Sequence, residues 1–210
     1  MGTATALWSF TLVVGLLTLT PGLDTALILR TAALGDRRQA WGVVLGIQTG
    51  TFVWGVLTSL GITALLTASH AAYTVLRWAG AAYLVVMGAR MLYDTWRRRP
   101  VAVVSAEPAS SGGMFAAWRR GALTNLLNPK VGAFYVALLP QFIPQGAPHV
   151  AFGVALTAIH IALGLVWSSV LIGFARVLRS WLAKPVARRV LDRITGTLIA
   201  GFGLRLAWSE

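Results

Sequence analysis

The chain has 210 residues, of which 57% are hydrophobic and only 11% are charged, and its mean hydropathy is +0.72. A soluble domain carries about 25% charged residues, so the composition argues against a water-soluble protein. There is no cysteine, which excludes disulfides, thiolate metal sites and cysteine nucleophiles.

Six apolar segments are each long enough to cross a hydrocarbon core of about 30 Å. In chain order they are residues 6–29, 40–66, 73–93, 122–143, 151–175 and 190–208. Residues 1–7 contain no Lys or Arg, and the apolar stretch that follows is too long for a signal-peptide core, so we expect the first helix to be retained. We therefore predict an all-α membrane protein with about six transmembrane helices.

The first span contains Pro21, Gly22 and Asp24. Proline removes a backbone N–H and clashes with the carbonyl one turn back, so it predicts a helix break. A carboxylate this deep in a span costs about 2.5–3.5 kcal/mol on insertion scales. Asp24 is therefore a candidate site for a substrate ammonium or a proton. The structural alternative is a salt bridge with Lys130 or Arg30 that only holds two helices together.

The second span has a row of small residues, Gly42, Gly46 and Gly50. The G-x-x-x-G-x-x-x-G spacing clears one helix face and lets a neighbouring helix approach closely. We expect this row to serve helix packing. The same face could act as a sliding surface, and the sequence does not separate the two roles.

The chain is predicted to consist of two halves. Residues 1–96 form the first three-helix half, residues 97–113 a cytoplasmic linker rich in Ser, Pro and Gly, and residues 114–210 the second half. Because three spans precede the linker, the second half starts on the opposite side of the membrane, as in an inverted repeat. The third span carries R-x-x-G-x7-G-x-R and the sixth carries R-x-x-G-x6-G-x-R, which supports this prediction.

The fourth span repeats the proline of the first, with Pro129 between Asn128 and Lys130, and Asn125 one turn earlier. Interrupted helices at corresponding places in two halves indicate a transport site near the midplane. The two amides could replace lost backbone partners, which would be a purely structural role. Lys130 could instead attract a carboxylate, so that Asp24 and Lys130 suit the two ends of an amino acid. The lone His160 of the fifth span is more often a bonded structural residue than a proton relay.

The basic residues predict the orientation. All Lys and Arg except Arg77 and Arg205 fall in or beside the three loops that follow the first, third and fifth spans. The positive-inside rule places these loops in the cytoplasm and both termini outside. The net charge of +12 is thereby explained without nucleic acid as a partner, because the basic residues alternate by loop and do not form one face.

Several of these motifs resemble the LysE/RhtB family of amino-acid exporters. The similar stretches are Thr20-Pro21-Gly22-Leu23-Asp24, the glycine row of the second span, Gly80-Ala81-Ala82-Tyr83-Leu84 and residues 121–142. The resemblance extends from about Phe10 to Ala207 and implies an inner-membrane exporter driven by the proton gradient. The family's first motif is usually P-G-P-D, whereas Leu23 stands at its third position here. The departure puts in doubt how sharply the first helix is broken.

We thus predict a secondary transporter that exports amino acids or close derivatives by alternating access. Asp24, Lys130, Asn125 and Asn128 are the predicted substrate or ion site, beside breaks at Pro21, Gly22 and Pro129. The alternatives are a passive channel and a non-transporting membrane scaffold subunit. The sequence has no Gly-rich phosphate loop, H-E-x-x-H or G-x-S-x-G motif, so we expect neither an enzyme nor a cofactor. The expected partners are the lipid bilayer, a small amino-acid-like solute and protons, and the small-residue faces permit a homodimer without requiring one.

Overall fold

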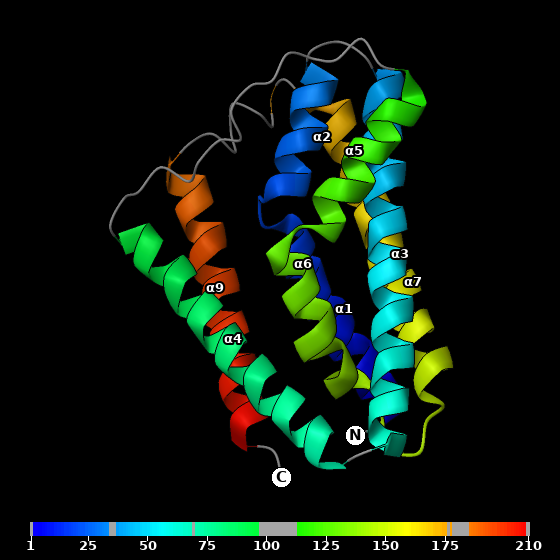
Figure 1. Cartoon of the computed structure of the whole chain (residues 1–210). Helices are drawn as coiled ribbons and strands as arrows, with labels where there is room; N and C mark the ends of the chain where they lie inside the picture. Colours follow the sequence, from blue (N-terminus) through cyan, green and yellow to red (C-terminus); the bar gives the residue numbers. More distant parts are fainter. Residues whose placement is uncertain are drawn as a thin grey trace.

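The computed structural model describes residues 2–33, 37–68, 70–96, 113–175, 177 and 185–208, and this part of the chain is helical without strands (Figure 1). The all-α prediction is therefore confirmed. The elements are α1 (Thr3–Leu19), α2 (Leu23–Ala33), α3 (Arg37–Ala68), α4 (His70–Trp96), α5 (Met114–Leu126), α6 (Pro129–Ala133), the π-helical turn η1 (Phe134–Leu138), the 3-10 turn η2 (Leu139–Phe142), α7 (His149–Gly173) and α9 (Pro185–Trp208).

Among the described residues, two helices are long and apolar enough to cross a membrane, and a bent pair gives a third span if it is taken as one unit. By length and composition, Arg37–Gly61 of α3 and the whole of α7 qualify alone, and α1 with α2 qualifies as a bent pair. Helices α4 and α9 overlap the predicted third and sixth spans, but α4 also carries two arginines and α9 carries four. The chain is thus a helical membrane protein, and the count of six spans stays a prediction.

The predicted breaks in the first and fourth spans are both present. Helix α1 ends at Leu19, α2 begins at Leu23, and the two axes differ in direction by 52°. A break occurs here although Leu23 replaces the family's second proline. In the second half, α5 ends at Leu126 and α6 begins at Pro129. Irregular backbone at membrane depth needs protein or a cavity around it, because lipid cannot satisfy its polar groups.

The fourth predicted span stays irregular beyond its break. A π-helical turn and a 3-10 turn follow α6, and Pro140 lies in the second of them. Since Pro140 has no N–H, the regular helical ladder cannot continue through it. The side-chain amide of Gln141 donates to the carbonyl of Ala137 at 2.7 Å. A side chain thus satisfies a carbonyl group where the helix is irregular.

The glycine row of α3 lies against α5. A Cβ on Gly42 would lie 2.8 Å from the carbonyl oxygen of Met114, and one on Gly46 would overlap the carbonyl of Trp118. A Cβ on Gly50 would lie 2.7 Å from Asn125 Oδ1. The two backbones therefore approach at a distance that only glycine permits, which is how helices associate closely in lipid.

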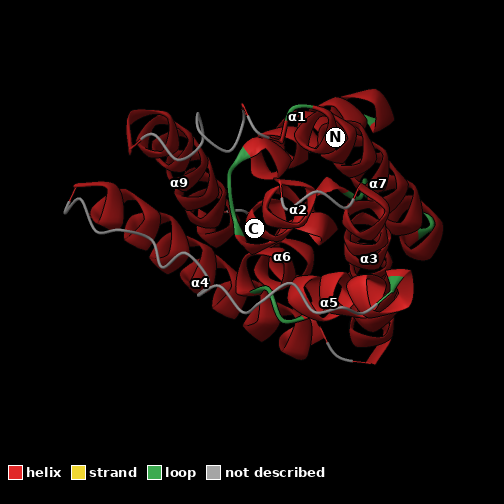
Figure 2. Cartoon of the chain, turned by 90° about the horizontal axis from the view of Figure 1, so that it is seen from above, coloured by secondary structure: helices red, strands yellow, loops and turns green. Residues whose placement is uncertain are grey.

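Two helix groups are visible from above (Figure 2). Helices α1, α2, α3, α5, α6 and α7 surround the two breaks, while α4 and α9 pack on each other at one side. Gly88 of α4 lies against the backbone of Gly196 in α9. The pairing of α4 with α9 and of α3 with α7 fits the predicted inverted halves, which remain a prediction. The linker, apart from Gly113, lies outside the described residues.

An aromatic cluster fills the core beneath the breaks. The ring of Phe10 in α1 lies 5.8 Å from that of Phe134 and 5.4 Å from that of Phe142, centroid to centroid. All three side chains are buried. Side chains of α1 and of the irregular fourth span thus interlock, which holds the two breaks opposite each other.

Candidate functional site

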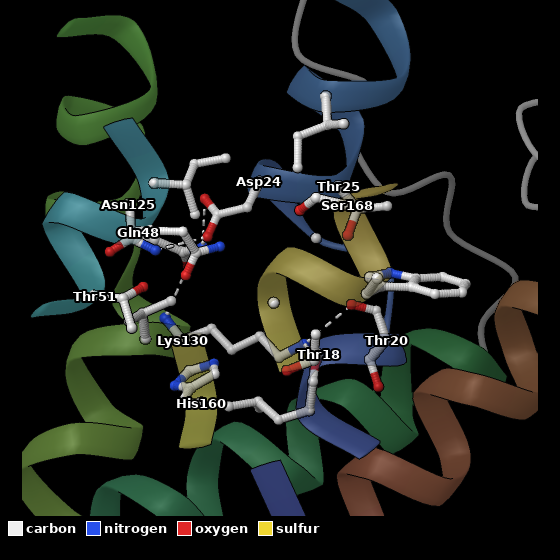
Figure 3. Close-up of a pocket in the computed structure, with 18 of the residues that line it drawn as sticks. Thr18, Thr20, Asp24, Thr25, Gln48, Thr51, Asn125, Lys130, His160 and Ser168 are labelled. Atoms are coloured by element: carbon white, nitrogen blue, oxygen red, sulfur yellow. Dashed lines mark hydrogen bonds between the residues drawn. The ribbon is translucent and has the colours of Figure 1, made fainter. Parts of the chain in front are cut away.

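The predicted site residues surround one cavity of about 80 Å³. Its walls come from both helix breaks and from α3 and α7 (Figure 3). The volume suits a small solute or a few water molecules and lies below the roughly 300–1,000 Å³ of drug-sized pockets. The four residues predicted to bind solute or ions, Asp24, Asn125, Asn128 and Lys130, all line it.

Asp24 lies in the first turn of α2 and is held by two amides of the second half. Asn125 Nδ2 donates to one carboxylate oxygen at 2.8 Å, and Asn128 Nδ2 donates to the other at 3.4 Å. An acidic group at a helix N-terminus is also stabilised by the helix dipole. The carboxylate therefore bridges the two broken helices through neutral donors.

Lys130 reaches across the cavity to the end of α1. Figure 3 shows its side chain extending from α6, between Asp24 and His160. Its Nζ donates to the carbonyl oxygens of Leu17 at 3.2 Å and Thr20 at 3.4 Å. In an unbroken helix the N–H of residue 21 would bond to the Leu17 carbonyl, but Pro21 has none. The Lys130 ammonium thus takes the place of a backbone donor and complements the negative end of the α1 dipole.

The second break has a cap of its own. Asn128 is the N-cap of α6, where its Oδ1 accepts from the backbone N–H of Lys130 at 3.1 Å. Pro129 follows at the first helical position, where its missing N–H costs nothing. Asn128 therefore has both the structural role predicted for an amide beside a break and a contact with Asp24.

Asn125 is oriented by the glycine row. It is 1% exposed, and its Oδ1 faces the site of Gly50 without a hydrogen-bond partner among the described residues. Because that oxygen lies against α3, the amide nitrogen points at Asp24. The third glycine of the row thus positions a group of the site as well as packing two helices.

His160 has a partner that the sequence analysis missed. Its Nδ1 lies 3.0 Å from the hydroxyl oxygen of Tyr135, and the two rings are stacked with centroids 5.7 Å apart. Tyr135 is fully buried and lies in η1. The bond supports the structural interpretation of His160, although its ring also lines the cavity. No short-range signal could have joined residues on two different spans.

Further polar groups of the wall were also missed. Thr25, Thr51 and Ser168 are each buried and line the cavity beside Gln48. Isolated hydroxyl residues are common in apolar helices, where they bond to the helix's own carbonyls. Their presence in one sequence therefore carries no signal of a shared site.

Comparisons with known proteins fit this geometry. The family model of LysE type translocator matches residues 14–210. A homoserine/homoserine lactone efflux protein of Salmonella typhimurium is 31% identical, over 91% of this chain and 91% of that protein. The uncharacterized membrane protein YrhP of Bacillus subtilis is 26% identical, over 94% of this chain and 96% of its own length. No solved structure gives a significant match. The chain belongs to the LysE type translocator family.

Proposed function

We propose that this chain is a secondary transporter that exports amino acids or close derivatives across the cytoplasmic membrane, coupled to protons. The observation that carries the proposal is the juxtaposition of two helix breaks around one cavity, with Asp24 held between them by two amides. Membership of a translocator family supports it, and so do the Salmonella relatives named for homoserine and homoserine lactone efflux.

In this proposal the two charged side chains bind opposite ends of the solute. Asp24 receives the ammonium group or a proton, and Lys130 pairs with the carboxylate. Lys130 now donates to the carbonyls of Leu17 and Thr20, so pairing with a carboxylate would weaken its hold on the end of α1. Binding is thereby linked to the angle at the first break, which is the change that alternating access requires.

The proposal also includes the orientation of the chain in the membrane and its location. The three basic loops face the cytoplasm, both termini lie outside, and the chain resides in the inner membrane. The two three-helix halves move relative to each other, so that the cavity between them opens to one side of the membrane at a time. A homodimer is compatible with this arrangement and is not needed for it, because both breaks and the cavity belong to one chain.

Efflux from preloaded cells tests the proposal. Cells are fed dipeptides to raise their internal amino acids, and the intact chain, Asp24→Asn and an empty vector are compared with and without a protonophore. We expect the intact chain to speed the loss of particular amino acids, and both the substitution and the protonophore to abolish the gain. Asparagine is the sharp replacement because it keeps the shape of Asp24 but has one acceptor oxygen, so its NH₂ group must face one of the two donor amides of Asn125 and Asn128.

Each alternative outcome of this experiment indicates one of the two alternative functions. Flux that persists with the protonophore and never becomes concentrative would indicate a passive channel. No flux with any solute, together with stability restored by exchanging the charges of Asp24 and Lys130, would indicate a scaffold subunit. Equal amounts of each variant in the membrane, measured by immunoblot, are required before either conclusion.

A further inference from the structure

Most described hydroxyls for which a hydrogen bond is resolved bond to their own helix. This is the usual fate of serine and threonine in apolar helices, where the carbonyl four residues back accepts the proton. The residues that bond in this way are Thr11, Thr18, Thr20, Thr31, Thr49, Ser59, Thr157 and Ser169. Hydroxyls that depart from this pattern inside the protein need another explanation.

Three hydroxyls of the cavity wall depart from it. Thr25, Thr51 and Ser168 are 6%, 2% and 2% exposed, and none has a hydrogen-bond partner in the part of the chain that the structure describes. The side-chain amide of Gln48, also on the wall, has none there either. The polar atoms of these four residues are not among the fully buried unpaired ones, so they open onto the cavity and can bond whatever occupies it. A solute that displaces water from them must replace those bonds, because each polar group left unpaired costs about 1–3 kcal/mol.

The four groups come from three helices that pack on one another. Figure 3 shows Thr25 of α2 and Ser168 of α7 on the same side of the cavity. A Cβ on Gly164 would lie 2.7 Å from Gln48 Nε2, so the amide of Gln48 lies against α7 one turn before Ser168. These residues differ from Asp24 and Lys130 in carrying no charge.

We propose that Thr25, Gln48, Thr51 and Ser168 form a subsite for an uncharged hydrogen-bonding group of the exported solute, such as a hydroxyl or a lactone carbonyl. The inference rests on the proposed function, in which Asp24 and Lys130 bind the charged ends. Hydroxyl and amide side chains both donate and accept, so they match a neutral polar group and gain nothing from a methyl group. An aliphatic solute would leave them unpaired at the moment of binding.

The test compares two solutes of equal size. Homoserine and norvaline differ by a hydroxyl in place of a methyl group, and both carry the same ammonium and carboxylate. We expect the intact chain to export homoserine about tenfold faster or more, because a site built to bond a hydroxyl rejects the analogue that lacks it. The ratio of the two rates within one preparation does not depend on how much protein is present.

Two substitutions and one matched control locate the preference. Ser168→Ala and the isosteric Thr25→Val should each lower the homoserine-to-norvaline ratio several-fold, by about the cost of one unmade hydrogen bond. Ser169→Ala removes a neighbouring hydroxyl that is exposed and bonded to the carbonyl of Leu165. It should leave the ratio unchanged.

The outcomes separate this inference from the proposed function. A ratio near one in the intact chain, or a ratio that survives both Ser168→Ala and Thr25→Val, would overturn the subsite while export stands. Thermal stabilisation of the purified chain by each solute gives a second reading without transport. Stabilisation by homoserine over norvaline in a chain that exports neither would retain the subsite and reject the exporter. Equal or absent stabilisation by both would reject the subsite.

Discussion

Each of the two helix breaks is associated with a proline, but the backbone groups at the two breaks are satisfied in different ways. At Pro129 the cap is local, because Asn128 accepts from the backbone N–H two residues on. At Pro21 the carbonyl left without its donor is bonded by Lys130, which belongs to the other half of the chain. Asp24, just after the first break, is likewise held by amides of the second half. The second break is therefore self-sufficient, whereas the geometry of the first depends on what Lys130 and Asp24 are bonded to.

Lys130→Met should have the largest effect on stability and efflux, because it removes the partner on which the first break depends. It removes the donor to Leu17 and Thr20 but keeps an apolar side chain of similar length. Because two charge-assisted bonds are lost, we expect the free energy of unfolding to fall by about 3 kcal/mol and efflux to be lost. Thermal unfolding in detergent measures the first effect. Lys130→Arg retains a cation and should keep most of the stability; a methionine variant as stable as the parent would show that the first break needs no partner.

Gly50→Ala should have an intermediate effect on efflux. It acts on the hydrogen bond from Asn125 to Asp24, which joins the two breaks. The new methyl group would lie 2.7 Å from Asn125 Oδ1, so the side chain must turn and its 2.8 Å bond to Asp24 is lost. Overpacking of this kind costs about 1–2 kcal/mol, and efflux should fall more than stability does.

Gly15→Ala is the matched control for that change. Gly15 lies in α1, and a Cβ there would meet no atom within 4 Å. Alanine in a helix interior is favoured over glycine by up to about 1 kcal/mol, so stability should hold or rise and efflux should not change. Equal loss of efflux in both variants would mean that Gly50 acts through general packing and not through Asn125.

Apart from the Gly15 control, substitution of Asn128 should have the smallest effect. Two different replacements separate its role as the N-cap of α6 from its bond to Asp24. Asn128→Ala removes the N-cap of α6, which costs about 1 kcal/mol, and also the 3.4 Å bond to Asp24. Asn128→Ser keeps a good capping oxygen but not the amide that reaches Asp24. We expect unfolding near that of the parent for serine, with a small loss of efflux in both variants. Equal destabilisation by alanine and serine would contradict the local cap.

The sequence indicated several of the residues that form the site, but it did not indicate which hydrogen bonds they make. Pro21, Pro129 and Asp24 were recognisable because proline and a carboxylate in an apolar span each carry a large intrinsic cost. A salt bridge of Asp24 with Lys130 or Arg30 was the structural alternative to a solute or proton site. The structure instead bonds Asp24 to amides and Lys130 to carbonyls, because a proline break leaves a carbonyl that only the surrounding fold can satisfy.

By itself, the sequence determined the class of the protein. Apolar runs of the length of a bilayer must become helices, since the backbone has to satisfy its own hydrogen bonds in lipid, and proline and glycine set where those helices break and approach. The tertiary structure alone decided which polar groups meet. The Tyr135 and His160 pair and the wall of Thr25, Gln48, Thr51 and Ser168 come from separate spans. Such contacts depend on how helices rotate and cross, which is set by packing along their whole length and not by any local pattern.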